Sequence, residues 1–111
     1  MPFQATPVHA HKAELFRTLG HPARVRILEL LRDGEMSVGA LQQELGLDSG
    51  GTSQHLGALR RIGVVASRRE GTGVWYSVPD AQVFALLEAG KEILARTLTE
   101  QQDVLRELSA E

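Results

Sequence analysis

Apolar residues recur at helical spacings of three and four through the first third of the chain, between breaks marked by glycine and proline. Leu15 and Leu19 belong to the apolar face of a first helix, predicted over residues 8–19. Pro22 suits the first turn of a second helix, predicted over residues 22–32, because its missing N–H has no partner there anyway. That second segment is apolar nearly all round, which predicts a central core helix.

Two shorter helices are predicted next, separated by a tight turn. Ser37 can cap the first of them and Gly46 can end it. Asp48 or Ser49 can cap the following helix only two or three residues later. Two helices joined by a short turn that contains glycine are typical of a helix-turn-helix, although any helical hairpin can show the same spacing. The inward positions of the second helix are Leu56, Leu59 and Ile62.

The pattern then changes from helical to strand-like. Residues 64–68 and 74–78 have strand composition, and the glycine-containing run 70–73 between them predicts a hairpin turn. A helix-turn-helix followed at once by a two-stranded hairpin is typical of a winged helix. The predicted fold is therefore mainly α with a small β-hairpin wing, in the order ααααββα.

A long helix is predicted over residues 80–109. Lys91 and Gln101 interrupt its apolar stripe. At 1.5 Å per residue the helix is a rod of about 45 Å, which a domain of this size cannot cover along its whole length. We therefore expect the first and last helices, 8–19 and 80–109, to form the interface of a homodimer. The alternative is a monomer with an exposed last helix. The stripe consists of Phe84, Leu87, Leu94, Leu98, Leu105 and Leu108.

Composition limits the class of protein. With 111 residues and 42% apolar residues, we expect one folded domain over residues 8–111 after a flexible N-terminus, residues 1–7. The absence of cysteine excludes disulfides, thiolate metal sites and a cysteine nucleophile. No apolar run is long enough to span a bilayer or to form a signal peptide, so we expect a cytoplasmic protein without a membrane partner. Without a phosphate-binding glycine motif or a plausible catalytic set, we expect no enzyme.

Charge is unevenly distributed along the chain. The net charge is −2, but residues 49–79 carry four arginines against Glu70 alone, for a net +3. A single basic segment in an acidic protein predicts one anion-facing surface; the alternative is an ordinary solvated face. The four arginines are Arg60, Arg61, Arg68 and Arg69.

Four runs of sequence together resemble the ArsR/SmtB family of bacterial regulators. They are LGHPARVRILELL (19–31), GEMSVGALQQELGL (34–47), SQHLGALRRIGVV (53–65) and SRREGTGVWYSV (67–78). The resemblance implies a homodimeric winged helix that binds a double-stranded DNA operator with approximate two-fold symmetry. It also implies repression that is relieved by a metal ion or, in some branches, by another signal.

The predicted DNA-contacting residues follow from the outward face of the fourth helix and from the wing. Ser53 and Gln54 are short hydrogen-bonding side chains suited to base edges. By resemblance, Ser49 matches a further base-contacting position. His55 lies in the same signature, and its alternative role is packing. Gly50 exposes backbone N–H groups that can approach phosphates. The full predicted set is Ser49, Gly50, Thr52, Ser53, Gln54, His55, Arg60, Arg61, Arg68 and Arg69.

Candidate metal ligands are few. The cysteine positions of the family's third-helix metal site are Ser37 and Gly39 here, and residues 80–111 contain no histidine. His9, His11 and Glu14 remain, and imidazole with carboxylate suits nickel, cobalt or zinc. Both histidines can bind one ion only if the helix begins after the first of them. The alternative is a regulator that needs neither metal nor another bound effector.

A different class of function is also open. A winged helix that has lost DNA binding can serve as a protein-interaction module. The net negative charge favours this reading, and so does Gly57, which stands where the family very often has a lysine.

Overall fold

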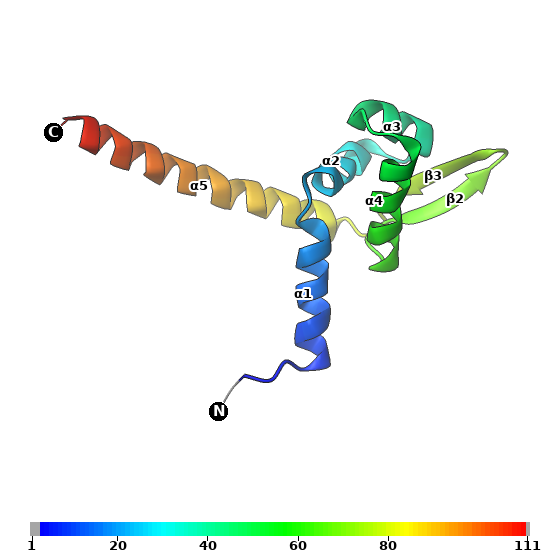
Figure 1. The fold of residues 1–111 in the computed structure, drawn as a ribbon, viewed down its shortest axis with the longest axis horizontal. Helices are drawn as coiled ribbons and strands as arrows, with labels where there is room; N and C mark the ends of the chain where they lie inside the picture. Colours follow the sequence, from blue (N-terminus) through cyan, green and yellow to red (C-terminus); the bar gives the residue numbers. More distant parts are fainter. Residues whose placement is uncertain (1–2, 111) are drawn as a thin grey trace. The chain divides into compact units, whose positions relative to one another are not determined.

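The computed structural model describes residues 3–110, and contacts divide the chain into two units, Met1–Ala81 and Gln82–Glu111. Figure 1 shows the elements in chain order. The first unit contains α1 (Pro7–Leu19), α2 (Pro22–Leu30), the 3-10 turn η1 (Leu31–Asp33), β1 (Met36–Ser37), α3 (Val38–Leu45), α4 (Ser49–Arg61), β2 (Ala66–Glu70) and β3 (Gly73–Ser77). The second unit is α5 (Gln82–Ala110). The predicted winged helix is confirmed.

Most helix boundaries follow the capping residues that the sequence offers. The Ser37 hydroxyl accepts a hydrogen bond from the backbone N–H of Ala40 at 3.1 Å and so caps α3. Gly46 ends that helix in the left-handed conformation, with φ of 66°, which glycine adopts without steric cost. The first helix begins one residue earlier than predicted, at Pro7, because Thr6 is its N-cap. Residue 7 therefore belongs to the helix and not to a flexible N-terminus.

The core lies where α2, α3 and α4 meet. α2 contacts α1, α3 and α4, and its Ile27 and Leu28 side chains are completely buried, so α2 is part of the core as predicted. Leu side chains fill most of the core, and burial of this kind contributes about 1.5–3 kcal/mol for each large apolar side chain. The apolar side chains that are at most 2% exposed are Ile27, Leu28, Leu31, Leu41, Leu56 and Leu59.

The wing differs from the predicted hairpin in two respects. Its strands form a three-stranded antiparallel sheet in the order β1-β3-β2, and the two-residue strand β1 was not predicted. Such a short strand has too few residues to show an alternating pattern. The first wing strand also begins at Ala66, because Val64 and Val65 are buried in the core and precede the sheet. Strand register is Arg68 opposite Trp75 and Arg69 opposite Val74.

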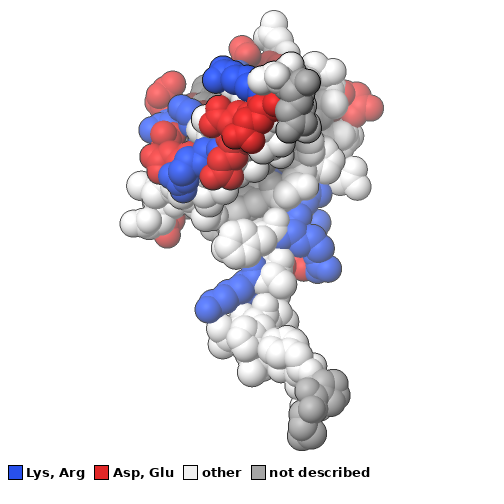
Figure 2. Space-filling view, turned by 90° about the vertical axis from the view of Figure 1, so that its left-hand side faces the viewer, with Lys and Arg blue, Asp and Glu red and all other residues white. Residues whose placement is uncertain are grey.

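The unit formed by α5 is a helix of 29 residues, close to the predicted span, and none of its described side chains is buried. The end of α5 that faces the viewer in Figure 2 carries interleaved acidic and basic side chains. Among the described residues, no helix is both long and apolar enough to cross a membrane.

Candidate nucleic-acid interface

The first half of α4 presents an uncharged polar surface. Ser49, Ser53 and Gln54 are exposed, whereas Leu56 and Leu59 point into the core. Ser53 lines one groove together with Val74 and Tyr76 of the wing strand β3. The three polar residues are therefore on the side of α4 that is available to a ligand, as the helical periodicity predicts.

The two glycines at the start of α4 have different surroundings. Asp48 is the N-cap, and its carboxylate oxygen Oδ1 accepts a hydrogen bond from the N–H of Gly51 at 2.6 Å. A Cβ on Gly51 would lie 2.9 Å from that oxygen, closer than real Cβ contacts. A Cβ on Gly50 would meet the same oxygen at 3.8 Å, which is an ordinary contact. The tight cap explains Gly51, while Gly50 is exposed and not required by packing.

Thr52 is a correction to the predicted DNA-contacting set. Its side chain is completely buried, and its hydroxyl donates to the backbone oxygen of Asp48 at 2.9 Å. Thr52 lies one turn before Leu56 on the inward face of α4. A contact between Thr52 and DNA was therefore a wrong prediction.

His55 connects α4 to the start of α2. Its Nδ1 accepts a hydrogen bond from Nε of Arg24 at 3.1 Å, and its ring lies 4.3 Å from that of His21. Arg24 also donates from Nη1 to the backbone oxygen of Thr18. Burial lowers the pKa of His55, and the charges of His21 and Arg24 lower it further. The structure thus gives His55 the packing role that the sequence left as the alternative.

A groove lies between α4 and the wing. Ser53 contributes from α4, Thr72 from the wing tip, and Val74 and Tyr76 from β3, while residues 37–39 at the start of α3 close one side. Ser53 is thus at the edge of a concavity bounded by the wing.

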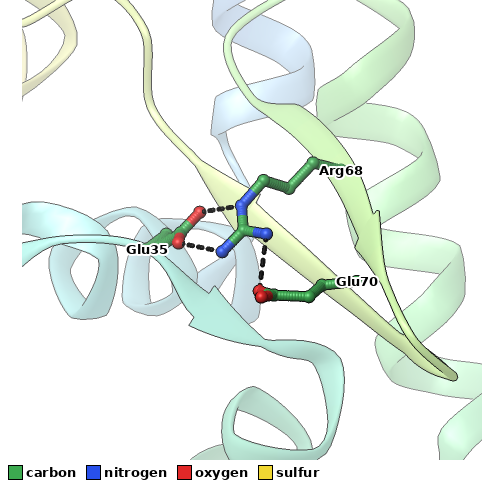
Figure 3. A network of polar contacts seen from close by, with 3 residues as sticks. All are labelled: Glu35, Arg68 and Glu70. Atoms are coloured by element: carbon green, nitrogen blue, oxygen red, sulfur yellow. Dashed lines mark hydrogen bonds and ion pairs between the residues drawn. The ribbon is translucent and has the colours of Figure 1, made fainter.

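Arg68 is bound to the scaffold on one face of the wing. Its guanidinium donates hydrogen bonds to both carboxylate oxygens of Glu35, and the bond from Nε to Oε2 is 2.8 Å long (Figure 3). Nη1 of Arg68 donates a further hydrogen bond of 2.8 Å to Oε2 of Glu70. It also lies 5.6 Å from the ring centre of Trp75. The hydrogen bonds from Arg68 lower the pKa of Glu35, and the two carboxylates raise the pKa of Arg68. Arg68 thus pairs with two carboxylates within the chain while its side chain stays 47% exposed, and its predicted phosphate contact stays a prediction.

Arg69 lies on the opposite face of the wing. Side chains alternate along a strand, so Arg69 shares a face with its register partner Val74, which lines the groove. Arg69 is exposed and makes no hydrogen bond or ion pair with any residue in the range 3–110. It is the wing cation that remains available to an anion.

The last turn of α4 provides two more cations. Arg60 and Arg61 are both exposed there. Cations at a helix C-terminus also interact favourably with the helix dipole, so the predicted anion contact and this structural role are compatible.

The predicted metal ligands do not form a site within the described chain. α1 begins at Pro7, so His9 and His11 lie in one helix two residues apart and do not share a face. Nδ1 of His9 lies 3.0 Å from the Thr6 hydroxyl in the capping box, and Glu14 pairs with Arg17. In residues 3–110 no three histidine, aspartate or glutamate side chains are grouped to hold an ion. The residues therefore do not fit nickel or zinc in one chain, and a metal response stays a prediction.

Comparison with known proteins agrees with this geometry. The profile of a helix-turn-helix domain family matches residues 19–68. An uncharacterised HTH-type transcriptional regulator of Mycobacterium tuberculosis H37Rv, Rv0081, is 46% identical over 108 residues, which cover 96% of this chain and 95% of the relative. Its crystal structure covers 87% of this chain and 98% of its own, with a TM-score of 0.81. The chain belongs to the ArsR/SmtB family of winged helix-turn-helix transcriptional regulators.

Two further relatives extend the ArsR/SmtB comparison. A biofilm growth-associated repressor of Xylella fastidiosa is 39% identical over 77 residues, covering 69% of this chain and 68% of the repressor. The solution structure of Mb0332 from Mycobacterium bovis is described as a homodimeric winged helix-turn-helix DNA-binding domain. It is 29% identical, covers 90% of this chain and 95% of its own, and has a TM-score of 0.75.

Three residues of this candidate nucleic-acid interface were not predicted from the sequence. Arg24 fixes His55 from 31 positions away, and Glu35 fixes Arg68 from 33 positions away. Thr72 lines the groove from the turn at the wing tip. Its place in a predicted hairpin turn was the only signal that could have indicated one of the three.

Proposed function

We propose that this chain is a homodimeric, sequence-specific DNA-binding regulator whose operator has approximate two-fold symmetry. The observation that carries the proposal is the exposed, uncharged polar face of α4 beside a wing that offers one available arginine. A polar face supplies hydrogen bonds to base edges, and a flanking cation supplies affinity for the phosphate backbone.

Each part of the interface has its own task in this proposal. α4 enters the major groove, where Ser49, Ser53 and Gln54 read bases; the amide of Gln54 suits a bidentate pair with adenine. The exposed N–H of Gly50 approaches a phosphate at the helix N-terminus. Arg69 from the wing, together with Arg60 and Arg61, contacts the backbone and adds affinity that depends on salt but not on sequence.

Two copies are needed for two half-sites. Large apolar side chains remain exposed on α1, where Val8 and Phe16 are 60% and 59% exposed, and along α5. An exposed apolar surface of this kind is typical of a protein–protein interface. The homodimeric state of the related domain Mb0332 supports the same assignment.

The direct test is a gel shift with the DNA upstream of the protein's own gene, at several salt concentrations. We expect a selective complex whose affinity falls steeply with salt. Gln54→Ala should weaken the selective complex by about tenfold and reduce discrimination between sequences, since one bidentate base contact contributes about 1–3 kcal/mol. The matched control is Gln4→Ala, at an exposed glutamine before α1.

Weak binding of equal strength to every DNA sequence would contradict the proposal and favour the protein-interaction module. The metal prediction has a separate test, which is calorimetry with nickel and with zinc on the wild type and on the double variant His9→Ala/His11→Ala. Equal affinities in the two proteins would remove these histidines as ligands.

A further inference from the structure

The groove between α4 and the wing has the dimensions of a ligand site. Its volume is about 510 Å³, within the range of about 300–1,000 Å³ that is typical of pockets for small molecules. Three elements border it: the start of α3, α4 at Ser53, and the wing strand β3 with its turn. The proposed base contacts account for Ser53 at the rim but not for the groove itself.

The hydroxyl of Tyr76 is the most informative group in this groove. Tyr76 lines the groove, and only 9% of its surface is exposed. Its hydroxyl makes no hydrogen bond or ion pair with any residue in the range 3–110. Among the described residues, no enclosed oxygen or nitrogen of a buried side chain lacks a partner, so this hydroxyl opens onto solvent through the groove. A buried tyrosine hydroxyl usually has a hydrogen-bond partner, so this one is placed for a partner from outside.

Other hydrogen-bond donors border the same groove. Ser53 and Thr72 are exposed and lie at its rim, on α4 and on the wing turn. Gly39 is the second residue of α3, and its N–H has no acceptor within the helix, because the Ser37 hydroxyl accepts from Ala40 instead. None of the described residues that line the groove is acidic. The groove therefore offers donors from three elements without a negative charge.

Two sources of positive potential lie beside these donors. Arg69 shares a face of the wing with Val74, which lines the groove, and it makes no ion pair with any described residue. The N-terminus of the eight-residue helix α3 adds the positive end of a helix dipole. This combination favours a ligand with several anionic oxygens, and phosphate is the common example.

We propose that the groove binds the terminal phosphate of a small phosphorylated molecule, and that the bound molecule excludes DNA. DNA also carries phosphate, but a backbone phosphate is attached to a sugar on each side and stays at the rim. A terminal phosphate has a single attachment and three acceptor oxygens, so it can reach the Tyr76 hydroxyl below the rim. Val38 and Val74 offer apolar surface to the rest of the molecule.

This inference rests on the proposed function, because Ser53 belongs to both surfaces. Ser53 reads a base in the proposed complex with DNA, and it also borders the groove. A molecule in the groove covers Ser53 and places negative charge beside Arg69, where DNA would bring its own phosphates. The molecule and DNA therefore compete, and each lowers the affinity of the protein for the other by the same factor.

A titration with inorganic phosphate, followed by NMR, tests the site in the free protein. The amide signals of Gly39 and of residues 72–76 should shift and saturate at millimolar phosphate, but not with sodium chloride at equal ionic strength. Tyr76→Phe should weaken this binding about tenfold, because a hydrogen bond to a charged group is among the stronger ones. The melting temperature should not change, since the hydroxyl has no partner in the fold. Ser77→Ala removes the neighbouring hydroxyl from the opposite face of β3 and is the matched control.

Variants of Gly39 test the charge of the ligand. A Cβ at Gly39 would meet no atom within 4 Å, so a side chain fits there. Gly39→Asp places a carboxylate in the first turn of α3, where negative charge stabilises a helix, so the variant should fold. It should abolish phosphate binding, whereas Gly39→Asn, of the same size but uncharged, should retain most of it. Phosphate binding that persists in Gly39→Asp, or that is unchanged in Tyr76→Phe, would overturn the proposal.

Gel shifts distinguish the two sources of phosphate. Inorganic phosphate should displace DNA from the wild type more effectively than sodium chloride at equal ionic strength. Tyr76→Phe should bind DNA as the wild type does and should lose this extra sensitivity. If instead Tyr76→Phe loses DNA affinity and free phosphate shifts no signal, the groove holds the DNA backbone; this inference then fails and the regulator proposal stands. If phosphate binds as expected but DNA binding is unselective, the regulator proposal fails and the phosphate site stands.

Discussion

The start of α4 and the wing each contain two adjacent like residues, and in both places the structure separates their roles. At the helix, Gly51 is held by the Asp48 cap whereas Gly50 is open. On the wing, Arg68 is bound to Glu35 and Glu70 whereas Arg69 is exposed. In each pair one residue maintains the scaffold and its neighbour is available for contact.

The causes of the two separations differ. In the helix, only the N–H of Gly51 reaches the capping carboxylate, at 2.6 Å, so a local contact determines which glycine has the structural role. On the wing, side chains alternate along β2, so Arg68 and Arg69 lie on opposite faces. The long-range partner Glu35, just before β1, then determines which arginine has the structural role. Stability measurements can test the different roles of the two glycines, and DNA-affinity measurements can test the different roles of the two arginines.

The largest expected effect is on the wing. Arg69→Ala should lower DNA affinity about tenfold at moderate salt and reduce the salt slope by about one for each copy, because it removes a phosphate contact. Arg68→Ala, the matched control, should change affinity by less than about threefold, because its charge is already neutralised. Gel shifts across a salt series measure both. Equal losses in the two variants would remove the distinction between the faces.

At the helix start, alanine should stabilise the fold at Gly50 and leave its stability nearly unchanged at Gly51. Gly50→Ala should stabilise the fold by up to about 1 kcal/mol through helix propensity. Gly51→Ala displaces the Asp48 carboxylate and should forfeit about 1 kcal/mol of capping, which offsets that gain. Urea unfolding of the two variants measures the difference. A similar gain in both would show that the cap tolerates a side chain.

Acid should loosen the bound arginine. The pKa of Glu35 is lowered below its ordinary value of 4.5 by Arg68, so its stabilising effect is complete above pH 4.5 and is lost as pH falls through the lowered pKa. Glu35→Gln should remove this contribution to the loss of stability in acid. The same variant should speed amide hydrogen exchange over residues 66–77 at neutral pH. Melting temperatures between pH 3 and pH 7, with Glu29→Gln as the control at another exposed carboxylate, test it.

The smallest expected effect involves His55. Its pKa lies below the ordinary 6.5, so the unfolded chain binds a proton more readily and stability falls as pH drops below 6.5 through the lowered pKa. His55→Gln should have a weaker pH dependence of the melting temperature between pH 5 and pH 7. The wild-type slope persisting in the variant would assign the effect to another group.

The sequence predicted those features that depend on neighbours in the chain. Ser37, Gly46 and Asp48 mark helix ends through contacts within a few residues, and the apolar stripes identified the core of α2 and α4. Thr52 was predictable too, because it continues the inward stripe of Leu56 and Leu59. Its polar hydroxyl suggested an exposed position, but a hydroxyl that donates a hydrogen bond to the backbone of its own helix can be buried.

The division between Arg68 and Arg69 was beyond sequence reasoning. The predicted strand ended at residue 68, whereas β2 continues to Glu70, and only the true register reveals which face each arginine occupies. The partners Arg24 and Glu35 lie more than 30 positions from the residues they hold. No local pattern reports such contacts.

The exposed apolar stripe of α5 has a consequence for how this protein responds to its own abundance. Apolar surface that only a second molecule covers makes stability a function of protein concentration. While monomers predominate, the population of pairs grows with the square of the monomer concentration. A chain that contacts DNA only as a pair would then convert a twofold change in its expression into a nearly fourfold change in the DNA-binding species.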